Sequence, residues 1–357
     1  MKFEPDINTL LDVISRRRIS QRIPNYEPYY NTRTVSMVIS KPFPGGPYRT
    51  AEACREVLKV VIEYQLAIKC DFIPIYLEGP TLPMKRGELR TEEEKEYFTQ
   101  RDIPTILSRE DYEKYPWPNE DEIGLSDNDK MMLEIASEIL PDGMGIMASC
   151  GGIYEVMNYL VGYENFCYLL ADDPELIDEL ANRLGKRNLE IFSEVSQYDC
   201  VYILHMGDDI AYRGGTLVKP ELLRRWLFPW MKKYTEIAHS YGKLFTFHSD
   251  GNFKPVAEDI VQAGVDGKQA FEDVSYRVTD FKQDYGHLIS VLGGIDVDML
   301  VRLSEDDVRR YVRKVLNVCV QGGGYAIGSG NCFAPYIPVN NYMAMLDEAE
   351  FYKGKGY

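Results

Sequence analysis

Short apolar, β-rich runs alternate along this chain with longer amphipathic stretches, and this alternation limits the possible folds more than any other sequence feature. The eight apolar runs are Val35–Ile39, Phe72–Leu77, Gly145–Ala148, Val201–His205, Leu244–His248, Gly267–Phe271, Leu288–Leu292 and Tyr325–Ile327. Stretches with apolar residues at helical spacing lie between most of them, for example Ala51–Ile68, Pro174–Ser196, Pro220–Tyr241 and Glu305–Gln321. Strands that alternate with helices pair in parallel, so eight such units predict an α/β protein with a (β/α)8 TIM barrel.

Residues that start and stop helices support this division. Proline near the first helical turn or a capping serine marks the starts, at Pro174, Pro220, Pro255 and Ser304. Glycines mark the ends, at Gly242, Gly264 and Gly286. A doubly wound open sheet is the alternative, but no GxGxxG pattern follows the first run, so its dinucleotide-binding motif is missing.

The length of 357 residues fits one barrel domain, residues 1–357, with an N-terminal helical extension and one long insertion. The insertion, residues 79–130, is charged, contains proline and follows the second predicted strand. In a barrel it would emerge at the carboxyl ends of the strands, where barrel active sites lie. Long loops of this kind are usually functional, so the segment is predicted to be a lid, with a plain surface excursion as the alternative.

The charge balance excludes some partners. Forty Lys and Arg against 56 Asp and Glu give a net charge of −16, which repels phosphate backbones and anionic lipid surfaces. We therefore expect neither nucleic-acid nor membrane binding. Acidic residues interrupt the N-terminal stretch at Glu4, Asp6 and Asp12, and a cytoplasmic location is predicted. The seven cysteines include no CxxC pair, so a disulfide framework is not expected.

Polar and reactive side chains gather where five consecutive predicted strands end. These ends read His205-Met206-Gly207-Asp208-Asp209, His248-Ser249-Asp250-Gly251-Asn252, Phe271-Glu272-Asp273, Gly293-Gly294-Ile295-Asp296 and Gly328-Ser329-Gly330-Asn331-Cys332. Catalytic groups of barrel enzymes project from the carboxyl ends of the strands. The five ends together therefore predict an active site.

These groups permit three chemistries. His248, Cys332 and a carboxylate offer the N, S and O ligands of catalytic zinc with an open position. Without metal, Asp208, Asp209 or Asp250 would act as general acid or base. Cys332 beside a histidine would be a nucleophile.

Each group also has a structural interpretation. Asp250-Gly251-Asn252 is typical of a turn, and Asp208-Asp209 of a helix cap. His205 would be a hydrogen-bonded core histidine, and Cys332 an inert thiol.

Several segments resemble the uroporphyrinogen decarboxylase superfamily, including its corrinoid-linked methyltransferase branch. They are GYENFCYLLADDPELIDELANR, YILHMGDDIAYRGGTLVKPELLRRWLFPWMKK, GKLFTFHSDGNFKPVAEDIVQAGVDG, GGIDVDML and GGGYAIGSGNCFAPYIPVNNYMAM, covering the chain from Gly151 onward. RRRISQRIP is similar to the opening passage of the family. The resemblance implies a (β/α)8 barrel, in agreement with the strand count.

The resemblance favours the methyltransferase branch over true decarboxylases. Those carry an Arg- and Gln-bearing motif near the first strand that grips porphyrinogen carboxylates, whereas this chain has Lys41-Pro42-Phe43-Pro44-Gly45-Gly46 after its first apolar run. Methyltransferase members hold zinc through a His-x-Cys and a later Cys, and the matching positions here are His248, Asp250 and Cys332. Asp250 replaces the first cysteine, and Asn331 occupies the family position beside Cys332. An oxygen-rich site suits an ether oxygen better than a thiol.

The leading hypothesis is a zinc-dependent methyltransferase of the O-demethylase type, which moves a methyl group between a small methoxylated or methylated molecule and a corrinoid carried by a partner protein. Its predicted residues are His248, Asp250, Cys332 and Glu272 for metal, Asp208, Asp209 and His205 for catalysis, and Asn331, Asp296 and Tyr212 for substrate. A homodimer is possible. The alternatives are a metal-free decarboxylase of a tetrapyrrole or small acid, and a non-catalytic ligand-binding barrel.

Overall fold

The computed structural model describes residues 3–18, 20, 22–84, 103–119 and 122–352. Seven parallel strands form one sheet in the order β1-β2-β3-β6-β7-β8-β9. Their bounds are β1 Phe72–Tyr76, β2 Gly145–Gly151, β3 Val201–Gly207, β6 Leu244–His248, β7 Gly267–Gln269, β8 Ser290–Leu292 and β9 Tyr325–Ala326. Apart from the hairpin β4 Ala211–Tyr212 and β5 Gly215–Thr216, neighbours in the sheet follow one another along the chain. The predicted α/β class and parallel strands are confirmed.

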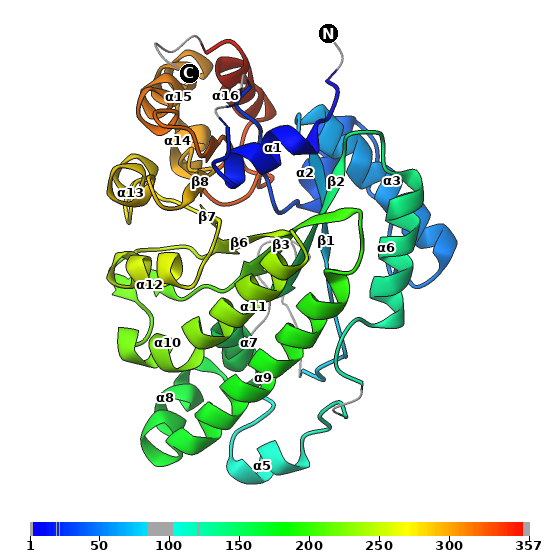
Figure 1. Ribbon diagram of the computed structural model, residues 1–357, viewed down its shortest axis with the longest axis vertical. Helices are drawn as coiled ribbons and strands as arrows, with labels where there is room; N and C mark the ends of the chain where they lie inside the picture. The colour runs from blue at the N-terminus through cyan, green and yellow to red at the C-terminus, as the bar shows by residue number, and fades with distance from the viewer. Residues whose placement is uncertain (1–2, 19, 21, 85–102, 120–121, 353–357) are drawn as a thin grey trace.

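Helices surround the curled sheet (Figure 1). Before β2 they are α1 Ile7–Ile14, α2 Thr32–Ile39, α3 Ala51–Ala67, α5 Arg109–Lys114 and α6 Asp127–Ile139. Between β2 and β6 they are α7 Ile153–Val161, α8 Tyr163–Asp172, α9 Pro174–Val195, α10 Pro220–Trp226 and α11 Phe228–Ser240. Later helices are α12 Ala257–Gln262, α13 Val278–Tyr285, α14 Val297–Arg302, α15 Glu305–Cys319 and α16 Val339–Glu350. Among the described helices none is both long and apolar enough to cross a membrane.

The first predicted strand is wrong. Val35–Ile39 belongs to helix α2, because the Asn31 side chain accepts hydrogen bonds from the N–H groups of Arg33 and Thr34 and so starts a helix. Seven of the eight predicted strands are present, and the inserted segment consequently follows the first strand of the sheet.

Asn25, from the segment before β1, lies between the two edge strands β1 and β9. Asn25 forms parallel bridges both to Cys70, just before β1, and to Ile327, just after β9. Tyr26 donates its N–H to the carbonyl of Ile327 at 2.6 Å, and Ile327 donates back to Pro24 at 2.9 Å. Buried Glu27 strengthens this connection, since it accepts hydrogen bonds from Ser329, Phe333 and Tyr342.

The single helix predicted over Pro220–Tyr241 is two helices in the structure. Pro220–Tyr241 divides at Leu227 into α10 and α11, because Pro229 has no N–H to continue the helical ladder. The other boundary signals hold: Pro174 lies in the first turn of α9, and the Ser304 hydroxyl accepts from the Asp307 N–H.

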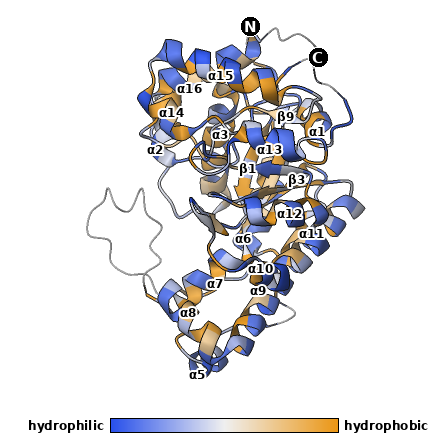
Figure 2. Cartoon of the chain, turned by 90° about the vertical axis from the view of Figure 1, so that its left-hand side faces the viewer, coloured by the Kyte–Doolittle hydropathy of each residue, from blue (hydrophilic) through white to orange (hydrophobic). Residues whose placement is uncertain are grey.

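The apolar core lies between the sheet and its helices. Helix α9 lies beside α11, and the ring of Phe192 packs 5.2 Å from Tyr234 and 5.5 Å from Phe245 of β6. Helices α5 and α8 lie at the end of the molecule away from both chain termini, as Figures 1 and 2 both show. The hydropathy colouring of Figure 2 shows both hydrophilic and hydrophobic residues along α8.

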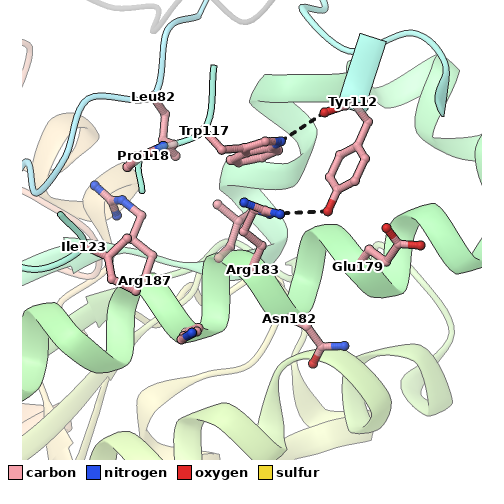
Figure 3. A pocket seen from close by; sticks show the side chains of 11 residues that line it. Leu82, Tyr112, Trp117, Pro118, Ile123, Glu179, Asn182, Arg183 and Arg187 are labelled. Atoms are coloured by element: carbon pink, nitrogen blue, oxygen red, sulfur yellow. Dashed lines mark hydrogen bonds between the residues drawn. The ribbon is translucent and has the colours of Figure 1, made fainter. Parts of the chain in front are cut away.

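Part of segment 79–130 packs against α9. The guanidinium of Arg183 stacks on the ring face of Trp117, 4.9 Å from its centroid, and the indole N–H donates to the carbonyl of Tyr112 at 3.1 Å (Figure 3). Arg109 forms a double hydrogen bond with Asp173 at 2.7 and 2.8 Å. The remainder of this predicted lid, residues 85–102 and 120–121, lies outside the described residues.

Candidate active site

Strand register assembles the site at the carboxyl ends of β3, β6 and β7. Gly207 of β3 pairs with His248 of β6, and His248 pairs with Gln269 of β7. The residues that follow β3 and β6, Asp209 and Asp250, are therefore brought to the same edge as His248. This edge is where parallel α/β proteins carry their ligands.

Asp209, His248 and Asp250 form a group able to hold a metal ion, with one ligand atom of each lying within 4.8 Å of the others. Nε2 of His248 lies 3.6 Å from Oδ1 of Asp209 and 3.9 Å from Oδ1 of Asp250. The Oδ1 atom of Asp250 is buried and has no hydrogen-bond partner among the described residues. An unpartnered carboxylate oxygen beside an imidazole nitrogen is a plausible position for a cation.

Hydrogen bonds from β7 and the segment after β9 orient these ligands. Oε1 of Gln269 lies within hydrogen-bond distance of Nδ1 of His248, which leaves Nε2 facing the two carboxylates. Gln269 donates its amide N–H to the carbonyl of Asn331 at 2.7 Å, and the Asn331 side chain donates to Oδ2 of Asp250 at 2.5 Å. The ring of Tyr29 packs edge-on to His248 at 5.0 Å.

Burial sets the electrostatics of the site. Burial raises the pKa of Asp250 to about 6, His248 opposes this shift, and the neighbouring carboxylate of Asp209 adds to it. Below the site, burial lowers the pKa of Lys268 to about 7. Its ammonium donates to the carbonyls of Ser249, Gln269 and Ala270, so it ties together the ends of β6 and β7.

Asp208 lies at the start of a helix. Its carboxylate accepts hydrogen bonds from the N–H groups of Ile153, Tyr154 and Glu155 at 2.8 to 3.0 Å, which are the first turn of α7. Burial raises its pKa to about 7 although these bonds favour the ionised form. Asp208 is thus placed as a helix cap, although of α7 and not of the helix that follows it in sequence, and its predicted catalytic role stays untested.

His205 is a buried core histidine. Nδ1 lies 2.8 Å from Oγ1 of Thr246, and Nε2 lies 3.0 Å from the hydroxyl of Tyr29. Burial lowers its pKa well below the ordinary value, so the ring is neutral at pH 7. Its hydrogen-bond partners are hydroxyl groups, and its ring lies edge-on to that of His248 with the centroids 6.4 Å apart.

Two predicted metal ligands do not join the group. Cys332 is half-buried, burial raises the pKa of its thiol to about 12, and it lies outside the set of ligand atoms within 4.8 Å among the described residues. Glu272 lies outside the same set, and its carboxylate accepts from the Ser275 hydroxyl at 2.8 Å. The raised thiol pKa disfavours the thiolate that a metal-free cysteine nucleophile needs.

Of the three predicted substrate-binding residues, one contacts the candidate metal group and two have other contacts. Asn331 touches the site through Asp250. Asp296 instead caps α14, where it accepts from the N–H groups of Met299 and Asp273. Tyr212 belongs to β4 and is 55% exposed, with its backbone carbonyl bonded to Asn252.

A cleft with a volume of about 680 Å³ opens beside Asp209. Its other described lining residues come from α7, α8 and two loops: Pro104, Leu107, Tyr154, Glu155, Asn158, Gly162, Tyr163, Glu164, Asn165, Tyr168 and Leu217. This is large enough for a small organic molecule. Because Asp209 belongs both to the cleft wall and to the metal-ligand group, the cleft leads to the candidate centre.

A second pocket, of about 370 Å³, lies between α9 and the packed part of segment 79–130 (Figure 3). Trp117, Tyr112 and Arg183 line it, and it shares no lining residue with the first cleft.

Sequence reasoning missed Gln269 and Tyr29 as neighbours of His248. Gln269 lies inside the run Gly267–Phe271 and reads as part of a buried strand, although a glutamine there is itself a signal, because buried amides need partners. Tyr29 comes from a segment 219 residues before His248, and only the packing of that segment across the strand ends brings it near.

Known proteins similar to this chain agree with the fold. The family model of uroporphyrinogen decarboxylase (URO-D) matches residues 98–352. A solved methyltransferase from Methanosarcina mazei is 15% identical with a TM-score of 0.70, covering 97% of this chain and 98% of its own. A B12-independent methionine synthase from Shewanella sp. W3-18-1, solved with selenomethionine, is 12% identical with a TM-score of 0.59, covering 92% and 97%. No curated protein sequence matches.

Proposed function

Since this chain belongs to the uroporphyrinogen decarboxylase family, we propose that it is a metal-dependent methyltransferase that transfers a methyl group from a small substrate. The observation that carries the proposal is the group of Asp209, His248 and Asp250 beside a cleft at the strand ends. The similarity to two structures described as a methyltransferase and a methionine synthase supports the same reaction class.

The residues present suit a metal ion. One imidazole and two carboxylates are a donor set used by catalytic zinc, and three protein ligands leave a position for substrate. The unpartnered Oδ1 of Asp250 gives the set an oxygen that needs a cation. We propose zinc as the ion, held by Asp209, His248 and Asp250 in place of the Cys332 and Glu272 ligands predicted from sequence.

When bound, the ion would supply Lewis acidity that makes the methyl-bearing heteroatom a better leaving group. The protein residues do the positioning. Gln269 holds the ring of His248 with Nε2 toward the site, and Asn331 holds Asp250.

The finer parts of the proposal are the methyl acceptor and the substrate. We propose a corrinoid on a partner protein as acceptor and a methoxylated or methylated small molecule as donor, which makes the enzyme an O-demethylase. An oxygen-rich set of ligands supports this choice, because harder ligands favour a harder Lewis acid suited to ether oxygen. The predicted homodimer and cytoplasmic location stay predictions.

The architecture is proposed to be a closed barrel. The parallel bridges of Asn25 to both Cys70 and Ile327 support closure of the seven strands into a ring with residues 24–26 in the eighth position. We also retain one domain over residues 1–357, with 79–130 as a lid.

Decarboxylation of uroporphyrinogen is the competing function of this family, and the cleft opposes it. Among the described residues lining the cleft there are three carboxylates and no Lys, Arg or His. A polycarboxylate substrate would be repelled there, because like charges disfavour binding.

The decisive experiment compares metal content and methyl transfer in the wild type and His248→Ala. We expect about one zinc per chain by elemental analysis in the wild type, and loss of both zinc and turnover in the variant. His239→Ala serves as the matched control, because His239 lies 2.8 Å from Asp266 on the opposite end of β6 and is 44% exposed. A wild-type protein that binds no metal, even after zinc is added, would refute the proposal.

A further inference from the structure

The walls of the 680 Å³ cleft come from the two helices that follow β2. Residues of α7 form one side and the first turn of α8 forms another, and Pro104 packs against the turn between them at Gly162. Asp209 lines the end that leads to the candidate metal group. A molecule in the cleft would therefore have one end at the reactive centre.

The charged side chains among the described lining residues of the cleft are all acidic. They are Glu155, Glu164 and Asp209, and no described lining residue is basic. Helix α7 ends and α8 begins at Gly162, so the partial negative charge of one helix end lies beside the partial positive charge of the other. The carboxylates of Glu164 and Asp209 consequently give this part of the wall a negative potential, which attracts cations.

Aromatic rings complete the wall. Tyr163 is 57% exposed and Tyr168 60% exposed, so their rings are open to a ligand. The hydroxyl of Tyr168 donates to Glu164 at 3.2 Å, which orients both groups. Tyr154 is only 2% exposed, and its hydroxyl has no hydrogen-bond partner within the described part of the chain.

This combination differs from an ordinary acidic surface. Tyrosine faces beside carboxylates bind organic ammonium ions by cation–π attraction and charge. A neutral ligand would gain no electrostatic attraction to the carboxylates of the wall, and an anion would be repelled by them.

We infer that the substrate of this enzyme is an organic cation of the ammonium class, bound in the cleft lined by Tyr154, Tyr163, Tyr168 and Glu164. The identification as substrate rests on the proposed methyltransferase function. The binding of such a cation does not, because the cleft residues other than Asp209 are independent of the metal group.

The test is calorimetric titration of the metal-free protein with choline and with 3,3-dimethyl-1-butanol. The second compound has the same shape but carries a neutral carbon in place of the quaternary nitrogen. We expect choline to bind at least about tenfold more tightly, from cation–π attraction and the carboxylates together. Equal affinity for the two compounds, or no binding of choline to the folded protein, would overturn the inference.

Variants locate the binding. Tyr168→Leu and Glu164→Gln should each weaken choline binding several-fold, and both positions are exposed, so the protein should still fold. Tyr241→Leu is the matched control, because Tyr241 is 47% exposed at the end of α11 and does not line the cleft. Unchanged affinity in both cleft variants would place the cation elsewhere and overturn the inference.

The two proposals fail separately. Choline binding without zinc or methyl transfer would leave the cation site standing and refute the methyltransferase. Zinc-dependent methyl transfer from neutral substrates, without choline binding, would refute the cation site alone.

Discussion

The buried Oδ1 of Asp250 lies 3.9 Å from Nε2 of His248 and has no other partner among the described residues. Both residues end the same strand, β6, or follow it directly, and Asp209 approaches from the end of the neighbouring strand β3. The three candidate metal ligands thus come from two adjacent strand ends, and a third strand, β7, holds the histidine through Gln269.

Removal of the Gln269 side chain should weaken metal binding without removing a ligand. In Gln269→Leu the ring of His248 loses the partner of Nδ1, so we expect metal affinity to fall about 10- to 100-fold. Competition with a zinc-binding dye measures this change. Gln262→Leu, at an exposed position of α12, should retain full affinity, and an unchanged Gln269→Leu would show that Gln269 does not position the histidine.

Asp208→Ala should lower stability while leaving metal binding intact. The variant leaves three N–H groups of α7 without the carboxylate that accepts their hydrogen bonds, and loss of such a cap costs about 2 kcal/mol. Urea unfolding measures the loss, with Asp172→Ala as an exposed control. A variant with wild-type stability and no turnover would instead restore the catalytic role predicted from sequence.

The pair of His239 and Asp266 should stabilise the protein more at acidic than at alkaline pH. The hydrogen bond to Asp266 raises the pKa of His239 above its ordinary 6.5 in the folded state. The stabilisation is therefore complete below about pH 6.5 and is lost as the pH rises through the folded-state pKa. Because His239 is 44% exposed, the contribution should stay below about 1 kcal/mol.

Unfolding of wild type and His239→Ala between pH 5.5 and 8.5 tests this pair, in the range about the histidine pKa. The difference in unfolding free energy should shrink as the pH rises. A difference that grows with pH would contradict the assignment.

Trp117→Ala should loosen the part of segment 79–130 that packs on α9. The variant loses the contacts of the indole ring with Arg183 at 4.9 Å and Tyr115 at 4.3 Å. We expect tryptic cleavage at Arg109 and Lys114 to be at least about tenfold faster, the factor that 1.4 kcal/mol produces. Phe351→Ala, at a position 72% exposed, is the control.

The same variant examines the lid. If the segment covers the active site during turnover, kcat/KM should fall in Trp117→Ala while the bound metal is unchanged. Unaltered turnover together with faster cleavage would make the segment a surface excursion.

Local sequence patterns were sufficient for most of the architecture. Seven strands, the helix starts at Ser304 and Pro174, and the family membership follow from short-range signals. Two predictions failed although the deciding signals are local: Val35–Ile39 belongs to a helix that the Asn31 cap starts, and Pro220–Tyr241 divides just before Pro229. The proline was a local signal that the apolar periodicity obscured.

The sequence by itself determined which strand ends carry chemistry, because alternating strands and helices bring all carboxyl ends to one edge. Only the tertiary structure decided which of those groups meet. Asp208 and Asp209 are neighbours in sequence, yet one caps α7 and the other faces His248, since adjacent side chains leaving a strand point in different directions. Cys332 and Glu272 stand outside the metal group for the same reason: distances of a few ångströms depend on how strands and loops pack, and residue order does not encode them.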